Sequence, residues 1–266
     1  MKYKKIITSV LAIFLLLSIT ASLQFKKPKR ISHNVSSEAV NYTLSPTILS
    51  ILSLGQEKLI SSYLWMNTLL FSDHEHIKEG NVSWMSRRFD LISKFNPKFY
   101  ENYYYGGIYL SIIKDDVKSA EELFKSGLKH FIDHPDLMWN RAFNLCFELK
   151  KCKESLPLYI KLRDKYSMRF PLSGRIAAKI QNGLGLEEES FLTLYETYKV
   201  LPAGPIKEST QNTLYDLRRQ IDLKCLNSKK RNSKRCNKKD FFGNSYIYKN
   251  GIYSSKLRFN EKLKIQ

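Results

Sequence analysis

A twelve-residue pattern of small and large side chains occurs three times, as KSAEELFKSGLK at 118–129, KESLPLYIKLRD at 153–164 and EESFLTLYETYK at 188–199. Each copy begins 35 residues after the previous one. A small residue stands third in every copy, namely Ala120, Ser155 and Ser190. A large residue follows four positions later, namely Phe124, Tyr159 and Leu194. Because residues four apart share one helix face, the pattern predicts helices that approach a neighbour closely at the small residue.

Helical periodicity continues on both sides of these copies, and glycine, proline or short polar stretches interrupt it at intervals. A short helix is also predicted after Ser45-Pro46, ending at Gly55. The other predicted helices are 56–77, 83–95, 98–113, 116–131, 136–150, 153–166, 172–183, 186–199 and 206–225. Successive helices with short connections indicate an all-α domain at 46–226.

The 35-residue spacing of helix pairs resembles the tetratricopeptide repeat, whose period is about 34 residues. That family has an aromatic residue early in the first helix of each unit, which Tyr103 and Trp139 match and Gly174 does not. Small residues are expected one turn later and are found at Gly106, Gly107, Ala142, Ala177 and Ala178. Prolines expected after the second helices are Pro97, Pro135 and Pro171. The resemblance covers roughly 56–204 and implies a right-handed solenoid of antiparallel helix hairpins.

The predicted helix at 206–225 has the pattern of a capping helix, with one apolar and one charged side. Its apolar side carries Leu214, Leu217, Ile221 and Cys225. Its charged side carries Asp216, Arg218, Arg219 and Lys224. We therefore expect the first side to close the stack and the second to face water.

The N-terminal segment 1–25 is predicted to be a transmembrane anchor or uncleaved signal. Lysines precede an uncharged run at 6–23, which is just long enough to cross a bilayer as a helix. A cleavable signal peptide is the alternative, with Thr20-Ala21-Ser22 as a small-residue site. Basic residues at 26–30 oppose translocation of the following chain. The expected protein is a single-pass protein of a bacterial inner membrane, with a polar linker at 26–45 and the helical domain outside the cytoplasm.

The formal net charge of +19 is concentrated at the two ends of the chain. Residues 1–30 contain seven basic and no acidic residues, and 227–266 contain twelve basic and two acidic ones. The middle therefore keeps a net charge of only +2. Since nucleic-acid-binding domains usually carry their charge on the folded body, binding of nucleic acid or an anionic surface through the basic termini is the second hypothesis.

Cysteine spacing leaves two interpretations open. The four cysteines form two sequence-local pairs, Cys146 with Cys152 and Cys225 with Cys236. In an oxidising compartment they could form two disulfides, whereas in a reducing one they would be free thiols.

The tail at 227–266 begins with a basic stretch and then contains an aromatic segment. Asn250-Gly251 separates two short aromatic and branched runs, which is a strong signal for a two-residue β-hairpin. We expect this hairpin to dock against the helical stack, and a disordered tail is the alternative.

The sequence lacks the motifs of common enzymes, and we expect a non-enzymatic protein without a cofactor or metal. No phosphate-binding glycine loop and no nucleophile elbow is present. His74 and His76 are two residues apart, so on a helix they point in different directions and favour a solvated polar end over a metal site. An enzyme with an unfamiliar site ranks third among the hypotheses.

In the tetratricopeptide family the first helices of the hairpins line a concave groove that takes an extended peptide or a helix of a partner. The resemblance therefore implies a membrane-anchored scaffold that binds a protein or peptide, within a cell-envelope assembly. Carried over by position, the groove residues are Tyr104, Ile108, Ser111, Asn140, Asn144, Phe147, Arg175, Lys179 and Asn182. Asn140 and Asn144 would hold a peptide backbone, and Arg175 with Lys179 an acidic group.

Overall fold

The computed structural model describes residues 46–72, 82–228 and 236–255, together with Ile13 and Ser18. The chain divides into two units, Met1–Thr43 and Leu44–Gln266, and the description below concerns the second. Within the described residues no helix has the length and apolar character needed to cross a bilayer. The predicted anchor at 1–25 and linker at 26–45 fall almost wholly outside the described residues.

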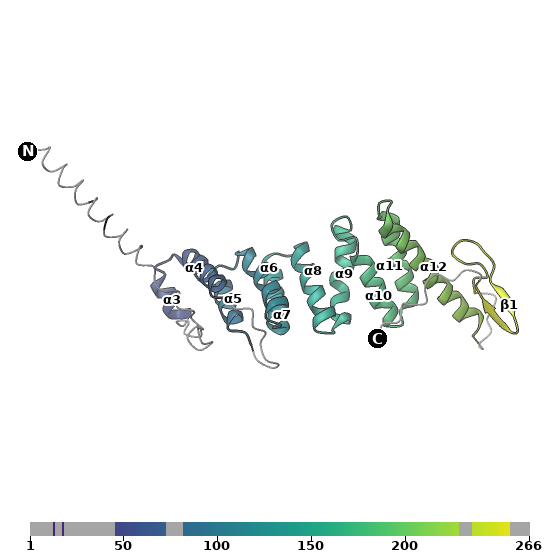
Figure 1. The fold of residues 1–266 in the computed structure, drawn as a ribbon, viewed down its shortest axis with the longest axis horizontal. Helices are drawn as coiled ribbons and strands as arrows, with labels where there is room; N and C mark the ends of the chain where they lie inside the picture. Colours follow the sequence, from purple (N-terminus) through teal and green to yellow (C-terminus); the bar gives the residue numbers. More distant parts are fainter. Residues whose placement is uncertain (1–12, 14–17, 19–45, 73–81, 229–235, 256–266) are drawn as a thin grey trace, which may run out of the picture. The chain divides into compact units, whose positions relative to one another are not determined.

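The second unit is helical, with one small hairpin near its C-terminal end (Figure 1). Two of the first helices of a pair end in a π-helical segment, labelled η. The helices are α3 (Pro46–Leu52), α4 (Glu57–Leu70), α5 (Trp84–Phe95), α6 (Tyr100–Ile108), η1 (Tyr109–Ile113), α7 (Val117–His130), α8 (Pro135–Phe143), η2 (Asn144–Glu148), α9 (Cys152–Tyr166), α10 (Ser173–Gly183), α11 (Glu187–Val200) and α12 (Pro205–Leu226), and the strands are β1 (Ile247–Lys249) and β2 (Ile252–Ser254). The predicted helical domain and C-terminal hairpin are confirmed.

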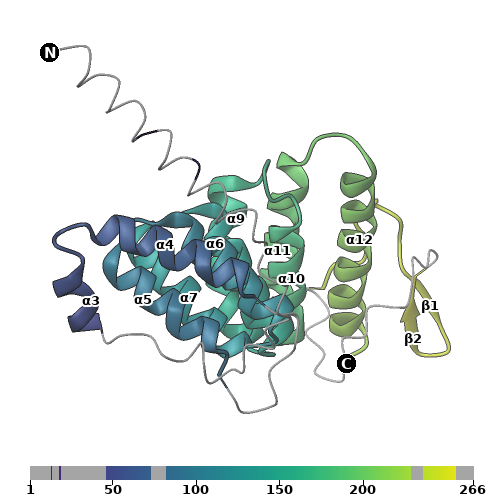
Figure 2. The same cartoon turned by 60° about the vertical axis from the view of Figure 1, so that its left-hand side comes forward.

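Helices that are consecutive in sequence pack on one another throughout the unit. The hairpins are α4 with α5, α6–η1 with α7, α8–η2 with α9, and α10 with α11, and each second helix also packs on the next first helix. Helix α12 packs on α11. Figure 1 shows the helices following one another in chain order, and Figure 2 shows α12 beside the hairpin strands β1 and β2 after a turn of the view.

The 35-residue period of the sequence is also present in the backbone. Asp115, Lys150 and Gly185, which are 35 residues apart, each have a positive φ, of 57°, 58° and 79°. All three lie in the turn between the first and second helix of a hairpin. Because a left-handed residue ends a helix and reverses the chain, these turns place the second helices in equivalent positions.

The small residues of the repeat lie where the helices of a pair approach closely. Ala120, Ser155 and Ser190 are fully buried, as predicted. Ser190 donates its hydroxyl to the carbonyl of Ala178 on the preceding helix at 2.7 Å. A larger side chain at Ser190 would separate α10 from α11, which explains the small residue at this position.

Gly174 stands where the first helices of the two preceding hairpins have an aromatic residue. The residue opposite Gly174 on the second helix differs as well. In the α6–α7 pair, the Tyr103 ring packs on Gly127, where an added Cβ would lie 2.8 Å from the ring. In the α10–α11 pair the bulk is on the opposite helix, because an added Cβ at Gly174 would lie 1.9 Å from Oγ1 of Thr197. The two pairs therefore fill the same space from opposite sides.

The C-terminal segment 236–255, called the docked segment below, packs on α12 and contains the predicted hairpin. Asn250 and Gly251 have positive φ values of 51° and 82°, as a type I′ turn requires. The Tyr246 hydroxyl donates to the buried Asp222 carboxylate at 3.0 Å. The side-chain amide of Asn227 bonds both backbone groups of Tyr253, at 2.8 and 3.0 Å.

The structure corrects the expectation that the charged side of α12 faces water. Asp216, which we predicted on the solvent side, is buried next to α10 and α11. Tyr215 and Asp222 are buried against the docked segment. The Tyr215 ring stacks on Phe242 with centroids 5.2 Å apart. Helix α12 thus lies between α11 and the docked segment, and the contacts come from residues remote in sequence.

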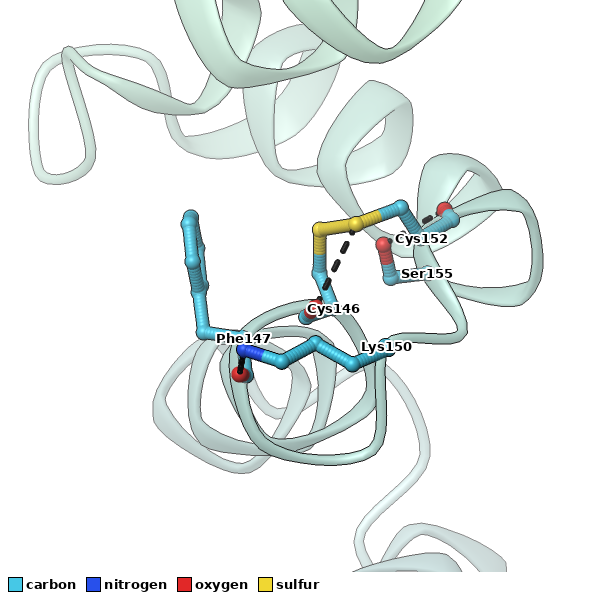
Figure 3. Close-up of a disulfide and its surroundings, with 5 residues drawn as sticks. All are labelled: Cys146, Phe147, Lys150, Cys152 and Ser155. Carbon is cyan, nitrogen blue, oxygen red and sulfur yellow. Dashed lines mark hydrogen bonds between the residues drawn. A yellow bond between two sulfur atoms is a disulfide. The ribbon is translucent and has the colours of Figure 1, made fainter. Parts of the chain in front are cut away.

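Both sequence-local cysteine pairs are joined as disulfides. Cys146–Cys152 connects η2 to the first residue of α9, across the turn that contains Lys150 (Figure 3). The Lys150 ammonium donates to the carbonyl of Phe147 at 2.6 Å, and the Phe147 ring extends away from Cys152. Cys225–Cys236 connects the end of α12 to the docked segment.

Candidate partner-binding site on the first helices

The first helices of three hairpins, α6–η1, α8–η2 and α10, end at equivalent positions. Their last residues are Ile113, Glu148 and Gly183, again 35 residues apart. In η1 and η2 the backbone bonds span five residues, from Lys114 N to Tyr109 O at 3.0 Å and from Leu149 N to Asn144 O at 2.9 Å. Side chains at matching positions of these helices therefore form comparable rows.

The structure corrects the register of the predicted groove in the first of these helices. The 35-residue period pairs Asn140 with Tyr105 and Phe147 with Ile112, one residue beyond the predicted Tyr104 and Ser111. Tyr105 and Ile112 are 55% and 63% exposed, whereas Ser111 is buried. Successive residues of a helix are about 100° apart around its axis. An assignment that is off by one residue therefore selects buried side chains in place of the exposed row.

The remaining predictions in α6 fall on side chains that belong to the core. Tyr104 and Ile108 are half-buried and pack against the first core cluster. The Tyr104 ring stacks on Tyr100 with centroids 5.6 Å apart. Both residues therefore pack beneath the exposed row that contains Tyr105 and Ile112, and do not belong to it.

Asn144 is a structural residue of the interior. Its side chain is buried and accepts the Ser111 hydroxyl at 2.7 Å. It also donates to the carbonyl of Val117, at 2.9 Å, at the start of α7. Asn144 thus ties η2 to the hairpin before it, and the structure corrects its predicted role in a groove.

The other predicted residues of α8–η2 lie at the surface. Asn140 is half-buried and donates to the carbonyl of Asp136 in its own helix at 2.9 Å. Phe147 is exposed and lies 4.8 Å, between centroids, from the exposed ring of Phe143. The two phenylalanines give this helix an apolar surface that the prediction recognised only in part.

The three predicted residues of α10 come together in one cavity of about 380 Å³ between α10, α11 and α12. Arg175, Lys179 and Asn182 lie on one wall. Helix α12 supplies the opposite wall with residues absent from the prediction: Thr213, Asp216, Leu217 and Gln220. These residues recur at helical spacing, which is the signal from which they could have been found.

The cavity has a positive charge that its own carboxylate does not neutralise. The Arg175 guanidinium donates to Ser209 Oγ at 3.1 Å, and burial lowers its pKa. Asp216 Oδ1 faces Arg219 at 3.3 Å, and burial raises the pKa of this carboxyl. Within the described part of the chain, no carboxylate forms an ion pair with Arg175 or Lys179.

Within the described residues, no three His, Cys, Asp or Glu side chains gather around one point. The His74–His76 stretch lies outside the residues that the structure describes. The site is therefore characterised by its apolar rows and its cationic cavity.

No family model, curated protein or solved structure matches the chain. The class of fold is therefore assigned from the observed helices and their packing. The protein is predominantly helical with packed consecutive helices, an arrangement compatible with a helical-repeat fold.

Proposed function

We propose that the protein is a tetratricopeptide-like scaffold that binds an extended segment of a partner protein along the first helices of its hairpins. The equivalent turns at Asp115, Lys150 and Gly185 support a repeat architecture, and its period is close to that of this family. The proposed architecture is a right-handed solenoid. No catalytic role is proposed.

Two features of the site define the chemistry of the proposed ligand. Exposed apolar side chains lie on α6–η1 and α8–η2: Tyr105, Ile112, Phe143 and Phe147. The next first helix, α10, presents Arg175 and Lys179 without a carboxylate partner among the described residues. A segment with large apolar side chains and an acidic group would complement both features. The unneutralised cationic cavity is the observation that carries this proposal.

A selection from a displayed random-peptide library tests this ligand chemistry. The unchanged protein is expected to enrich peptides that combine aromatic or aliphatic residues with Asp or Glu. The double variant Arg175→Glu, Lys179→Glu is expected to lose acidic peptides at least tenfold and to enrich basic ones, because the charge of the cavity is reversed.

The matched control is Lys118→Glu, Lys125→Glu, which makes the same change in net charge on exposed positions of α7. This variant should retain the acidic preference. If both double variants lose it equally, the selection reflects overall charge, and if neither does, the cavity does not bind the acidic group.

We also place the helical domain outside the cytoplasm, tethered by residues 1–25. Two disulfides suit an oxidising compartment, where such bonds persist. Binding to nucleic acid through the termini stays a prediction from the sequence, because most of 227–239 lies outside the described residues.

Trapping thiols in intact cells tests this location. After rapid acid quenching, a mass-tagged maleimide is expected to add nothing to the full chain, and four tags after reduction. Four tags without reduction would place the cysteines in a reducing compartment and contradict the proposed location.

A further inference from the structure

The two disulfides differ in how easily a reductant can reach them. Cys146 is only 5% exposed and belongs to a core cluster with residues of α8, α9 and α10. Cys225, in the last turn of α12, is the one exposed cysteine of the four, whereas Cys152 and Cys236 are half-buried. Thiol–disulfide exchange requires direct attack of a thiolate on one sulfur, so the Cys225–Cys236 bond is the more accessible target.

Positive charge is concentrated in the sequence around this second bond. The residues between Cys225 and Cys236 include five basic and no acidic ones, and the bond closes them into a short ring. Lys238 and Lys239 follow and are exposed, and the Lys238 carbonyl accepts the Tyr246 N–H at 3.1 Å. The residues between the cysteines of the other pair include only two basic residues and one acidic residue.

The nearest acidic residues in the sequence do not cancel this charge. Asp222 is paired with Arg218 at 2.7 Å. Asp240 accepts two backbone N–H groups of the docked segment, at 2.8 and 3.0 Å. The excess positive charge attracts an attacking thiolate and stabilises the thiolate that leaves, so it favours exchange at this bond.

The same bond restrains the docked segment. It joins the end of α12 to residue 236, and its two cysteines are 11 residues apart. Other contacts of the segment are noncovalent, among them the Tyr246–Asp222 hydrogen bond and the Phe242–Tyr215 stack. Closing a loop of this length lowers the entropy of the undocked chain, which favours docking roughly a hundredfold.

We propose that Cys225–Cys236 is a thiol–disulfide exchange site that accepts electrons from a dithiol, and that its reduction loosens the docked segment from α12. One thiolate of the dithiol attacks Cys225 Sγ, the S–S bond breaks, and Cys236 leaves as a thiolate. The second thiolate attacks the dithiol sulfur of this mixed disulfide, and Cys225 leaves. Two electrons and two protons have then passed to the cysteines, and the dithiol has become a disulfide. This exchange does not depend on the proposed peptide ligand.

Timed alkylation of the purified full chain, with both disulfides intact, tests the exchange. Dithiothreitol is the probe, samples are quenched with acid, and free thiols are labelled with N-ethylmaleimide before peptide mass spectrometry. We expect Cys225 and Cys236 to become labelled at least roughly tenfold faster than the Cys146–Cys152 pair. Equal rates, or the reverse order, would show that the second bond is as inert as the first and overturn the proposal.

Charge variants separate the role of the lysines from simple exposure. The double variant Lys238→Gln, Lys239→Gln should slow reduction of Cys225–Cys236 by roughly threefold or more. The matched control Lys150→Gln, Lys151→Gln removes the same charge beside the other disulfide and should leave this rate unchanged. If the two double variants behave alike, local charge does not activate the bond and the proposed exchange site is wrong.

Hydrogen exchange of the hairpin measures the consequence for docking. The Tyr253 amide, which donates to Asn227 at 2.8 Å, is expected to lose protection at least roughly tenfold when Cys225 and Cys236 are both replaced by serine. Replacing Cys146 and Cys152 by serine is the matched control and should leave hairpin protection unchanged. Unaltered protection without the Cys225–Cys236 bond would contradict its control of the docked segment.

Discussion

Replacing Gly107 by alanine is expected to lower the free energy of unfolding by about 2–3 kcal/mol, and the unfolding temperature by roughly 5–10 °C. An added Cβ would lie 2.3 Å from Cε1 and 2.6 Å from Cζ of Phe124. The Phe124 ring is fully buried between α6 and α7, so it can move only by displacing other core side chains. The measurement is thermal and denaturant unfolding.

Gly106→Ala is the matched control, because both glycines lie in α6 and gain the same helix propensity as alanine. Its added Cβ would meet its nearest neighbours at 3.2 Å, so we expect a change below about 1 kcal/mol. Phe124→Leu removes Cε1 and Cζ, the nearer two of the three ring atoms that an added Cβ would meet, and keeps an atom only at the Cδ1 position, 2.7 Å away. In the Gly107→Ala background it should recover at least about 1 kcal/mol relative to additivity. If the losses of stability in Gly107→Ala and Phe124→Leu simply add in the double variant, the assigned contact between position 107 and the Phe124 ring is wrong.

Replacing Asn144 by alanine is the second large effect expected, at about 2–3 kcal/mol of stability. The substitution removes the acceptor of the Ser111 hydroxyl and the donor to the Val117 carbonyl. Buried polar groups that lose their partners cost more than the bonds contribute when formed. Chemical denaturation measures the change.

Asn140→Ala provides the comparison, because the Asn140 amide bonds only a carbonyl of its own helix and is half-buried. Its cost should stay within about 1 kcal/mol. Equal stability of the two variants would show that Asn144 does not tie the hairpins together. The peptide preference of folded Asn144→Ala protein should be unchanged, because its side chain does not reach the surface.

Helix positions could be predicted because they depend on local signals. The breakers near Pro97, Pro135 and Gly185 separate segments whose apolar spacing is helical, and the observed ends fall within one or two residues of most predicted ones. The helix predicted at 56–77 is shorter in the structure, because α4 ends at Leu70. The last predicted residues, from 73 on, lie outside the described part of the chain. The turn at Asn250-Gly251 could also be predicted from the sequence, because few residue types adopt the backbone conformation of a type I′ turn.

The site could be predicted only where a position within the repeat decides exposure. Arg175, Lys179 and Asn182 were assigned together and line one cavity. Asn144 was misplaced, because its burial depends on Ser111, 33 residues away, and on a carbonyl at the start of α7. Asp216 was misplaced because it faces the cavity between α10, α11 and α12, where Arg219 lies 3.3 Å from its carboxylate, and a charged residue within α12 gives no sign of such a position.

The docked segment on α12 also has a consequence for association between molecules. The last helix of a repeat stack has a face on which a further hairpin could pack, including one from another molecule. In this protein the Tyr246 hydroxyl bonds Asp222 and the Phe242 ring stacks on Tyr215, so the chain itself occupies that face of α12. Removal of residues 236–255 is therefore expected to expose Tyr215 and Asp222 and to allow molecules to stack end to end.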